Sequence, residues 1–271
     1  MSLLWLWVAL GLYSLGLAHA LLTVVLRRPA WFRTGLAAIG LGALFHFVSL
    51  VEHGLTVDRF PATNIAEATS LLAFLLTLGF LLVYWRYRVE SLSVFTFPIV
   101  FVMTLASALS QQPATEVAPV LKSSWVPLHV SFALVGYTAL FLGCLGGVMY
   151  LIQERELKRH RPRAFYYRLP PLDTIDRLGS RVLAVGFPFI TVALLIGAAG
   201  AAGAWGPGWI HDPKVTFSFV LWFIYLLLIV SRVSAGWRGH KAALFAILGM
   251  AMALISWGAN YMSSHHTFLG H

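Results

Sequence analysis

Charged residues are scarce in this chain of 271 residues: Asp, Glu, Lys and Arg make up 11% of it, whereas hydrophobic residues make up 59%. A soluble domain draws about a quarter of its residues from these four types, because a folded surface must stay hydrated. The mean hydropathy of +0.80 points the same way. The composition excludes a soluble enzyme and a disordered scaffold, and it predicts an integral membrane protein.

Cysteine is almost absent as well. Cys144 is the single cysteine of the chain and lies inside an apolar run. This excludes an internal disulfide and a cysteine-based zinc or iron–sulfur site. The sequence also lacks a Ser-His-Asp arrangement, a glycine-rich phosphate loop and a paired-carboxylate signature. No independent catalytic constellation is present, so its status as an enzyme stays open.

Long apolar runs, by contrast, fill most of the chain. One helical crossing of a bilayer takes roughly 20 apolar residues, so this length accommodates about eight spans and no separate soluble domain. We therefore predict an all-α bundle of transmembrane helices forming one domain over residues 1–271. The predicted spans are 3–25, 35–56, 64–85, 92–109, 125–152, 181–203, 214–233 and 241–263.

The basic residues predict the topology. Sixteen of the 19 Lys and Arg residues fall in alternate connections, around residues 27–33, 86–88, 155–181 and 232–241. The opposite connections hold only Arg59, Lys122 and Lys214. The positive-inside rule then predicts an N-out and C-out protein with a basic cytosolic loop at 154–180. Because the membrane accounts for the positive charge, we expect lipid contacts and no nucleic acid.

Histidines gather on the predicted outer side. Seven of the ten lie from mid-membrane outward: His46, His53, His129, His211, His265, His266 and His271. His46 and His53 lie two helical turns apart and share one face with Ser49 and Leu50. A single histidine in a span is usually a hydrogen-bonded interior residue. The gathering of several on one side is what favours a ligand site.

An unusual outer loop at 204–214 separates the sixth and seventh predicted spans. Trp205 and Trp209 flank a Gly-Pro-Gly turn, and Asp212 precedes Pro213, a pattern typical of a helix N-cap. Interfacial tryptophans commonly anchor a protein in the membrane. Two indoles on a rigid loop also form a flat apolar platform, which suits a planar hydrophobic ligand.

Two histidines near this loop suggest what the ligand is. His129 lies in the first turn of the span at 125–152, and His266 follows the last span. Imidazoles carried by two helix ends could hold a haem iron from both faces, while Lys214 could meet a propionate. Zinc is the competing ion, but a structural zinc site takes four close ligands and only His265 and His266 are adjacent.

Acidic residues near the outer span ends allow two interpretations. Glu67 follows Asn64 by three residues, which fits a helix capping box. Ionisable groups at membrane depth are also functional candidates. Together with Glu52, His46 and His53, Glu67 could form the polar path of a transporter, although no paired repeat is present.

As a set, these segments resemble the cytochrome c assembly proteins of the CcsA/CcmC type, with their HemX-like and YpjD-like members. That family's loop reads Trp-Gly-x-x-Trp-x-Trp-Asp-Pro-Lys-Glu, and it is matched here by Trp205, Gly206, Trp209, Asp212, Pro213 and Lys214. His211 replaces the third aromatic residue and Val215 the closing Glu. Phe60, Pro61, Asn64, Glu67 and Ser70 are similar to a second family motif. The resemblance covers about residues 40 to 270.

The resemblance implies a haem-handling protein of the bacterial inner membrane that assists cytochrome c maturation. It implies haem b at the outer surface, with His129 and His266 as external ligands and with Trp205, Trp209, His211, Asp212 and Lys214 around it. Apocytochrome c and a second membrane assembly subunit would be its partners. A HemX-like regulator of tetrapyrrole biosynthesis, acting through the loop at 154–180, is the alternative. Whether His265 or His211 replaces a ligand stays open.

Overall fold

The computed structural model describes residues 1–26, 29–110, 123–159 and 166–263. Every regular element in these ranges is a helix, which confirms the all-α prediction. Eight of the helices found there are long and apolar enough to cross a membrane. The chain is a multi-pass membrane protein, as the composition predicted.

The helix bounds agree with the predicted spans to within a few residues at most ends. The long helices are α1 (Ser2–Leu26), α2 (Pro29–Val57), α3 (Ile65–Tyr87), α4 (Leu92–Leu109), α5 (Trp125–Lys158), α6 (Leu172–Trp205), α7 (Pro213–Ser234) and α8 (His240–Gly258). Short 3-10 turns are η2 (Tyr166–Arg168), η3 (Gly206–His211) and η4 (Ala259–Tyr261). Much of the predicted cytosolic loop at 154–180 is therefore helical, because α5 and α6 extend into it from both sides.

Contacts between helices group the chain into two compact units. The first comprises Met1–Glu116 with Tyr167–Pro170, and the second comprises Val117–Tyr166 with Pro171–His271. We call the helices α1 to α4 the first bundle and the helices α5 to α8, with η3 and η4, the second bundle. The single-domain interpretation of residues 1–271 and the N-out, C-out orientation stay predictions.

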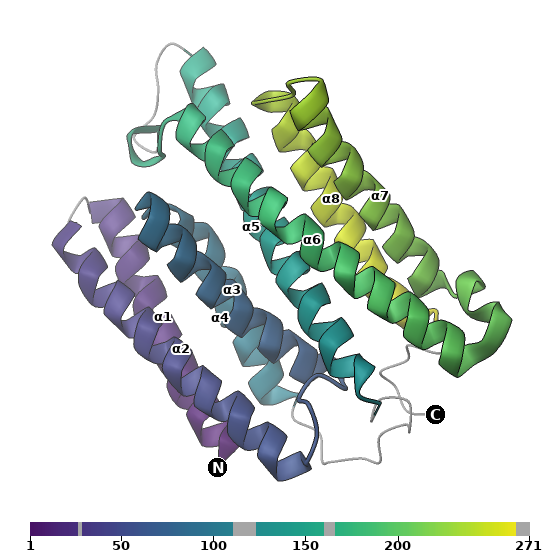
Figure 1. The fold of residues 1–271 in the computed structure, drawn as a ribbon. Helices are drawn as coiled ribbons and strands as arrows, with labels where there is room; N and C mark the ends of the chain where they lie inside the picture. The colour runs from purple at the N-terminus through teal and green to yellow at the C-terminus, as the bar shows by residue number, and fades with distance from the viewer. Residues whose placement is uncertain (27–28, 111–122, 160–165, 264–271) are drawn as a thin grey trace. The chain divides into compact units, whose positions relative to one another are not determined.

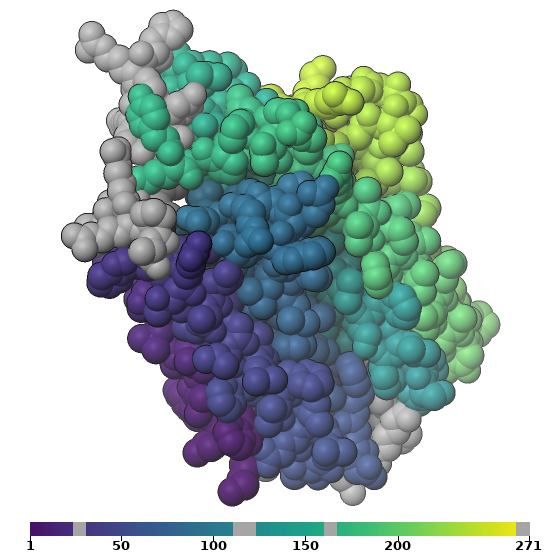
Figure 2. All heavy atoms as spheres, turned by 60° about the vertical axis from the view of Figure 1, so that its left-hand side comes forward, coloured from purple at the N-terminus to yellow at the C-terminus, as the bar shows by residue number. Residues whose placement is uncertain are grey.

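In the first bundle, α1 packs along α2 and α4, and α3 packs along α4 (Figure 1). Figure 2 shows α1 and α2, in purple to violet, lying against each other at its surface. Three buried threonines in this bundle satisfy their hydroxyls locally: Thr77, Thr96 and Thr104 donate to the carbonyl one turn earlier, at 3.0, 2.9 and 2.8 Å. Such local bonds let polar residues lie inside an apolar bundle.

In the second bundle, α5 packs along α6 and α8, and α7 packs along α8 (Figure 1). Glycines make the close approaches possible: a Cβ at Gly147 would lie 2.9 Å from the carbonyl oxygen of Ala243 on α8. Such small residues let two helices approach closely in a membrane. Tyr225 lies in the core of this bundle, and its hydroxyl donates to the carbonyl of Leu183 at 2.9 Å.

Candidate functional site

His129 lies in the first turn of α5 with its ring against α6. Its Nδ1 is 2.8 Å from the carbonyl oxygen of Ala193. A carbonyl can only accept, so Nδ1 carries the proton and donates it. The lone pair of the neutral ring is then on Nε2, for which the described residues provide no hydrogen-bond partner. A fixed tautomer with an open Nε2 is the arrangement found in histidines that ligate metals.

Two glycines of α6 form the surface on which this ring packs. A Cβ at Gly197 would lie 2.5 Å from Cε1 of His129, and a Cβ at Gly200 would overlap the indole of Trp125. The Trp125 and His129 rings are themselves in contact, with centroids 6.1 Å apart and planes at 66°. Residues four apart on α5 therefore pack on residues three apart on α6.

The sequence analysis missed this pairing. Small residues such as those at 197–203 usually indicate helix–helix packing, and the sequence alone did not connect Trp125 to them. The usable signal was the matched spacing of a Trp-x-x-x-His pair in one span and a Gly-x-x-Gly pair in the next. In the structure the glycines accommodate side chains rather than a neighbouring backbone.

Asp212 connects three parts of the second bundle. Its Oδ1 accepts from the backbone N of Lys214 at 2.9 Å, which confirms the predicted cap on α7. Its Oδ2 accepts from the hydroxyl of Ser263 at 2.5 Å. Asp212 is only 4% exposed. The carboxylate therefore joins the start of α7 to the chain that leaves α8 and η4.

Lys214 extends from the same cap towards α8. Its Nζ donates to the carbonyl of Ser256 at 2.8 Å. The ammonium also lies close enough to His129 to interact with it electrostatically. Lys214, Asp212 and His129 thus lie at the same end of the second bundle.

The indoles and His211 lie between α6 and α7 in this bundle. Trp205 is the last residue of α6, and Trp209 and His211 belong to η3, which turns the chain into α7 (Figure 1). Gly206, at the turn, has a φ of 69°, which favours glycine. Both indoles are partly exposed and His211 is exposed. His265 and His266 lie outside the described residues, so the predicted pair of axial ligands stays a prediction.

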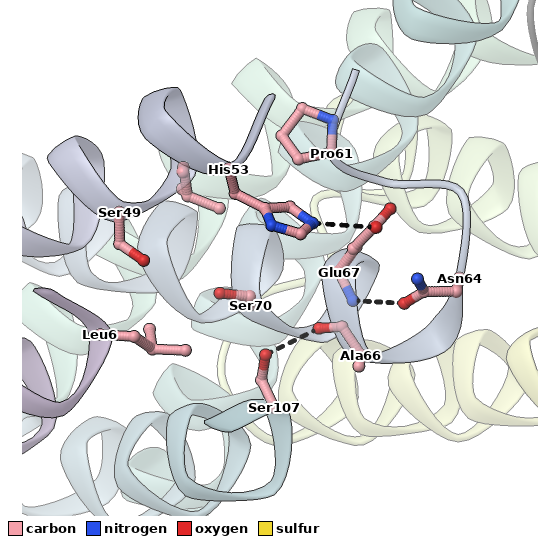
Figure 3. Close-up of a pocket in the computed structure, with 10 residues that line it drawn as sticks. Leu6, Ser49, His53, Pro61, Asn64, Ala66, Glu67, Ser70 and Ser107 are labelled. Atoms are coloured by element: carbon pink, nitrogen blue, oxygen red, sulfur yellow. Dashed lines mark hydrogen bonds and ion pairs between the residues drawn. The ribbon is translucent and has the colours of Figure 1, made fainter. Parts of the chain in front are cut away.

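A second polar cluster lies in the first bundle, where α2 ends and α3 begins (Figure 3). Glu67 accepts from both Nη atoms of Arg59 at 2.8 and 2.9 Å and pairs with Nε2 of His53 at 3.1 Å. Asn64 caps α3 by accepting from the backbone N of Glu67 at 2.8 Å, and Glu67 accepts from the backbone N of Thr63 at 2.8 Å. Glu67 therefore takes part in the cap that its position suggested, and its part in a functional site stays a prediction.

A small cavity adjoins this cluster and leads to a buried histidine. His46 is 0% exposed. Its Nε2 is 2.9 Å from the hydroxyl of Ser70, which lines the cavity, and its Nδ1 is 3.3 Å from the hydroxyl of Tyr13. Both ring nitrogens are thus occupied. Over the described residues, no group of three or more His, Cys, Asp or Glu side chains gathers as a metal site would require.

These features define a class: a polytopic helical membrane protein with an exposed tryptophan-rich turn and a histidine with a fixed tautomer at one end of a bundle. Comparison with known proteins narrows the class, because residues 43–266 match the family model described as cytochrome C assembly protein. The chain belongs to the cytochrome c assembly protein family.

Two similar curated proteins bear a name from cytochrome c biogenesis. The chain is 31% identical over 244 residues to "Cytochrome c biogenesis protein CcsA" of Prochlorococcus marinus (strain MIT 9515), covering 81% of this chain and 78% of that one. It is 27% identical over 310 residues to the protein so named in Gloeobacter violaceus, covering 94% of this chain and 90% of that one.

Among solved structures, the fold is similar to that of "Cytochrome c Heme Lyase CcmF". The TM-score is 0.65 at 18% sequence identity, with all of this chain covered. This chain spans 46% of the CcmF chain, so it corresponds to about half of that protein. At this identity the likeness shows the fold alone.

Proposed function

We propose that this protein binds haem at the outer surface of the membrane and assists cytochrome c maturation. His129 is one axial ligand of the iron and His266 is the other. The observation that carries the proposal is the hydrogen bond from Nδ1 of His129 to the carbonyl of Ala193 at 2.8 Å, which leaves Nε2 available to a metal. The names of the CcsA relatives and of the CcmF structure support the haem and cytochrome c assignment.

The donor set fits haem. Imidazole nitrogen is a common axial ligand of haem iron, and a backbone acceptor on the second ring nitrogen raises the basicity of the first. Trp205 and Trp209 supply apolar surface beside the turn, and the charge of Lys214 suits a propionate carboxylate.

Chain connectivity supports His266 as the second ligand. Ser263 is bonded to Asp212 at 2.5 Å, and His266 follows three residues later. Three residues of extended chain span at most about 11 Å, which is the reach that the proposed ligand has from Ser263. His265 and His211 are the alternatives to His266, so the test must show which of the three histidines is the second ligand.

Haem b supplies vinyl groups that can form thioethers with cysteines of an apocytochrome. The part of this chain is to bind and orient, since it carries no nucleophile or base arrangement of its own. Apocytochrome c would therefore dock beside the turn at 204–214, with a second membrane subunit completing the assembly machinery. We place the protein in the bacterial inner membrane with this turn facing outward.

The test is an absorbance spectrum of the full chain purified from cells that make haem. We expect a Soret band that is weakened by His129→Ala and by His266→Ala and retained in His211→Ala and His265→Ala. A colourless wild type that also fails to bind added hemin would overturn the proposal. The regulator alternative predicts a different result. Neutralising the basic residues of 154–180 would then change tetrapyrrole biosynthesis, and both ligand variants would behave as wild type.

A further inference from the structure

The cavity of the first bundle is polar and small enough to hold only water. Side chains from all four helices and from the α2–α3 connection line it (Figure 3). Its polar lining consists of Ser49, His53, Asn64, Glu67, Ser70 and Ser107. The space open to the centres of water-sized molecules is about 40 Å³, which is room for about three waters.

The lining offers such waters the partners they need. Ser49 donates to the carbonyl of Ser2 at 2.7 Å, and Ser107 donates to the carbonyl of Ala66 at 2.9 Å. Each hydroxyl oxygen keeps lone pairs that can accept from a water, and the amide of Asn64 can donate. A buried water makes about three hydrogen bonds, which this lining can supply.

The inner end of the cavity continues into a chain of hydrogen bonds. Ser70 lines the cavity and is 2.9 Å from Nε2 of His46, whose Nδ1 is 3.3 Å from the hydroxyl of Tyr13. In neutral imidazole one nitrogen donates and the other accepts, and a hydroxyl can take either part. The chain from the cavity through Ser70 to His46 can therefore pass a proton without moving a helix.

The other end of the cavity carries the charged cluster. The titratable or charged groups that face this path are Tyr13 from α1, His46 and His53 from α2, Arg59 from the α2–α3 connection, and Glu67 from α3; the α4 residue that lines it is Ser107. The His53 side chain is 26% exposed and that of Glu67 is 8% exposed. His53 therefore lies at the surface of the bundle, and its partner Glu67 lies inside.

We propose that waters in this cavity connect the His53–Glu67 end of the first bundle to His46, so that His46 exchanges protons with the aqueous phase at that end. A hydronium ion gives one proton to the water chain. Ser70 takes a proton from the nearest water and gives its own to Nε2 of His46. The hydronium becomes water, His46 becomes an imidazolium that donates to Ser70 and Tyr13, and no electron is transferred. The return of the proton reverses each step.

The experiment measures hydrogen–deuterium exchange of the Nε2–H of His46 in the full chain, which is labelled with 15N-histidine, held in lipid nanodiscs and acidified until the ring is an imidazolium. His46→Gln identifies its signal. In wild type we expect exchange within minutes of transfer to D2O. Ser107→Leu fills the cavity without touching a hydrogen-bond partner of His46, and we expect it to slow exchange at least about tenfold, because exchange then requires local opening.

Two further variants complete the design. Ser70→Ala is nearly isosteric and removes the hydroxyl that joins the cavity to His46, so it too should slow exchange. Thr104→Val on α4 is the matched control, because Thr104 is buried, bonds only to the carbonyl of Val100 at 2.8 Å and does not line the cavity. A wild-type N–H that persists for hours, or equal rates in wild type, Ser107→Leu and Ser70→Ala, would overturn the proposal. Haem binding plays no part in these measurements.

Discussion

His46 in the first bundle is fully buried and His129 in the second is partly exposed, and the surroundings of the two rings prepare them for different chemistry. His46 has hydroxyl groups at both ring nitrogens, at 2.9 and 3.3 Å. His129 has one carbonyl at Nδ1 and no described partner at Nε2. The number of ring nitrogens with a hydrogen-bond partner, and the kind of atom that is the partner, distinguish the two sites.

The partner atoms explain the difference. A hydroxyl donates or accepts, so the neighbours of His46 leave its tautomer free to change and suit it to proton exchange. A main-chain carbonyl only accepts, so Ala193 fixes the tautomer of His129 and suits Nε2 to a metal. Changes to either set of partners should therefore affect one bundle and spare the other.

The largest effect we predict is on the stability of the first bundle. Arg59→Ala leaves the buried carboxylate of Glu67 without its two bonds to Arg59, and breaking such a buried pair costs about 3–5 kcal/mol. Denaturant unfolding of the protein in bicelles measures this loss. Hemin affinity should stay at the wild-type value, and a parallel loss of hemin affinity would contradict the separation of the two sites.

The next effect is on hemin binding and compares the two histidines directly. Removing an axial ligand costs more than removing an outer partner, so His129→Gln should weaken hemin binding by more than about 100-fold. His46→Gln should leave the affinity unchanged, since its nitrogens are engaged by Tyr13 and Ser70. Titration of both apoproteins with hemin checks the pair. Equal losses in the two variants would mean that His46 is also a ligand.

Much of the fold could be predicted from the sequence, because a long apolar run of this kind crosses a bilayer as a helix. The spans at 92–109 and 214–233 nearly coincide with α4 and α7. The Asp212 cap followed from its position before Pro213. The lengths of α5 and α6 did not follow, because charged residues such as Lys158 continue a helix beyond the apolar run.

The candidate site was less accessible, because its decisive contacts join residues that are remote in sequence. His129 could be singled out from its place in a Trp-x-x-x-His opening. Its bond to Ala193, 64 positions away, depends on the register of α5 against α6. The bond between Ser263 and Asp212 likewise depends on how the segment after α8 returns to α7. Hydropathy does not determine the register of one helix against its neighbour, so these contacts could be seen only in the structure.

The glycine beneath His129 gives a finer comparison. In Gly197→Ala the new Cβ would lie 2.5 Å from Cε1 of His129, so the ring must move and its bond to Ala193 must weaken. Loss of such an outer contact costs about 10- to 100-fold in metal affinity, and we expect hemin binding to weaken by that factor. Gly203→Ala on the same helix is the matched control, because nothing lies within 4 Å of its Cβ. The proposed geometry fails if the two variants bind hemin alike.

The smallest predicted effect concerns the bond that holds the end of η4 to α7. Ser263→Ala removes the hydroxyl from Oδ2 of Asp212 but keeps the cap bond from Lys214 to Oδ1. A typical intramolecular hydrogen bond contributes about 0.5–1.5 kcal/mol net, and Asp212 keeps its bond from Lys214, so we expect a loss of about 1 kcal/mol. If the bond positions the second ligand, this loss appears as an approximately fivefold weaker hemin affinity, since 1.4 kcal/mol corresponds to tenfold.

Ser218→Ala, which removes the hydroxyl 3.2 Å from Ser256, is the control. If hemin affinity is unchanged in Ser263→Ala while unfolding is easier, the bond serves the bundle alone, and the second ligand is positioned by other contacts.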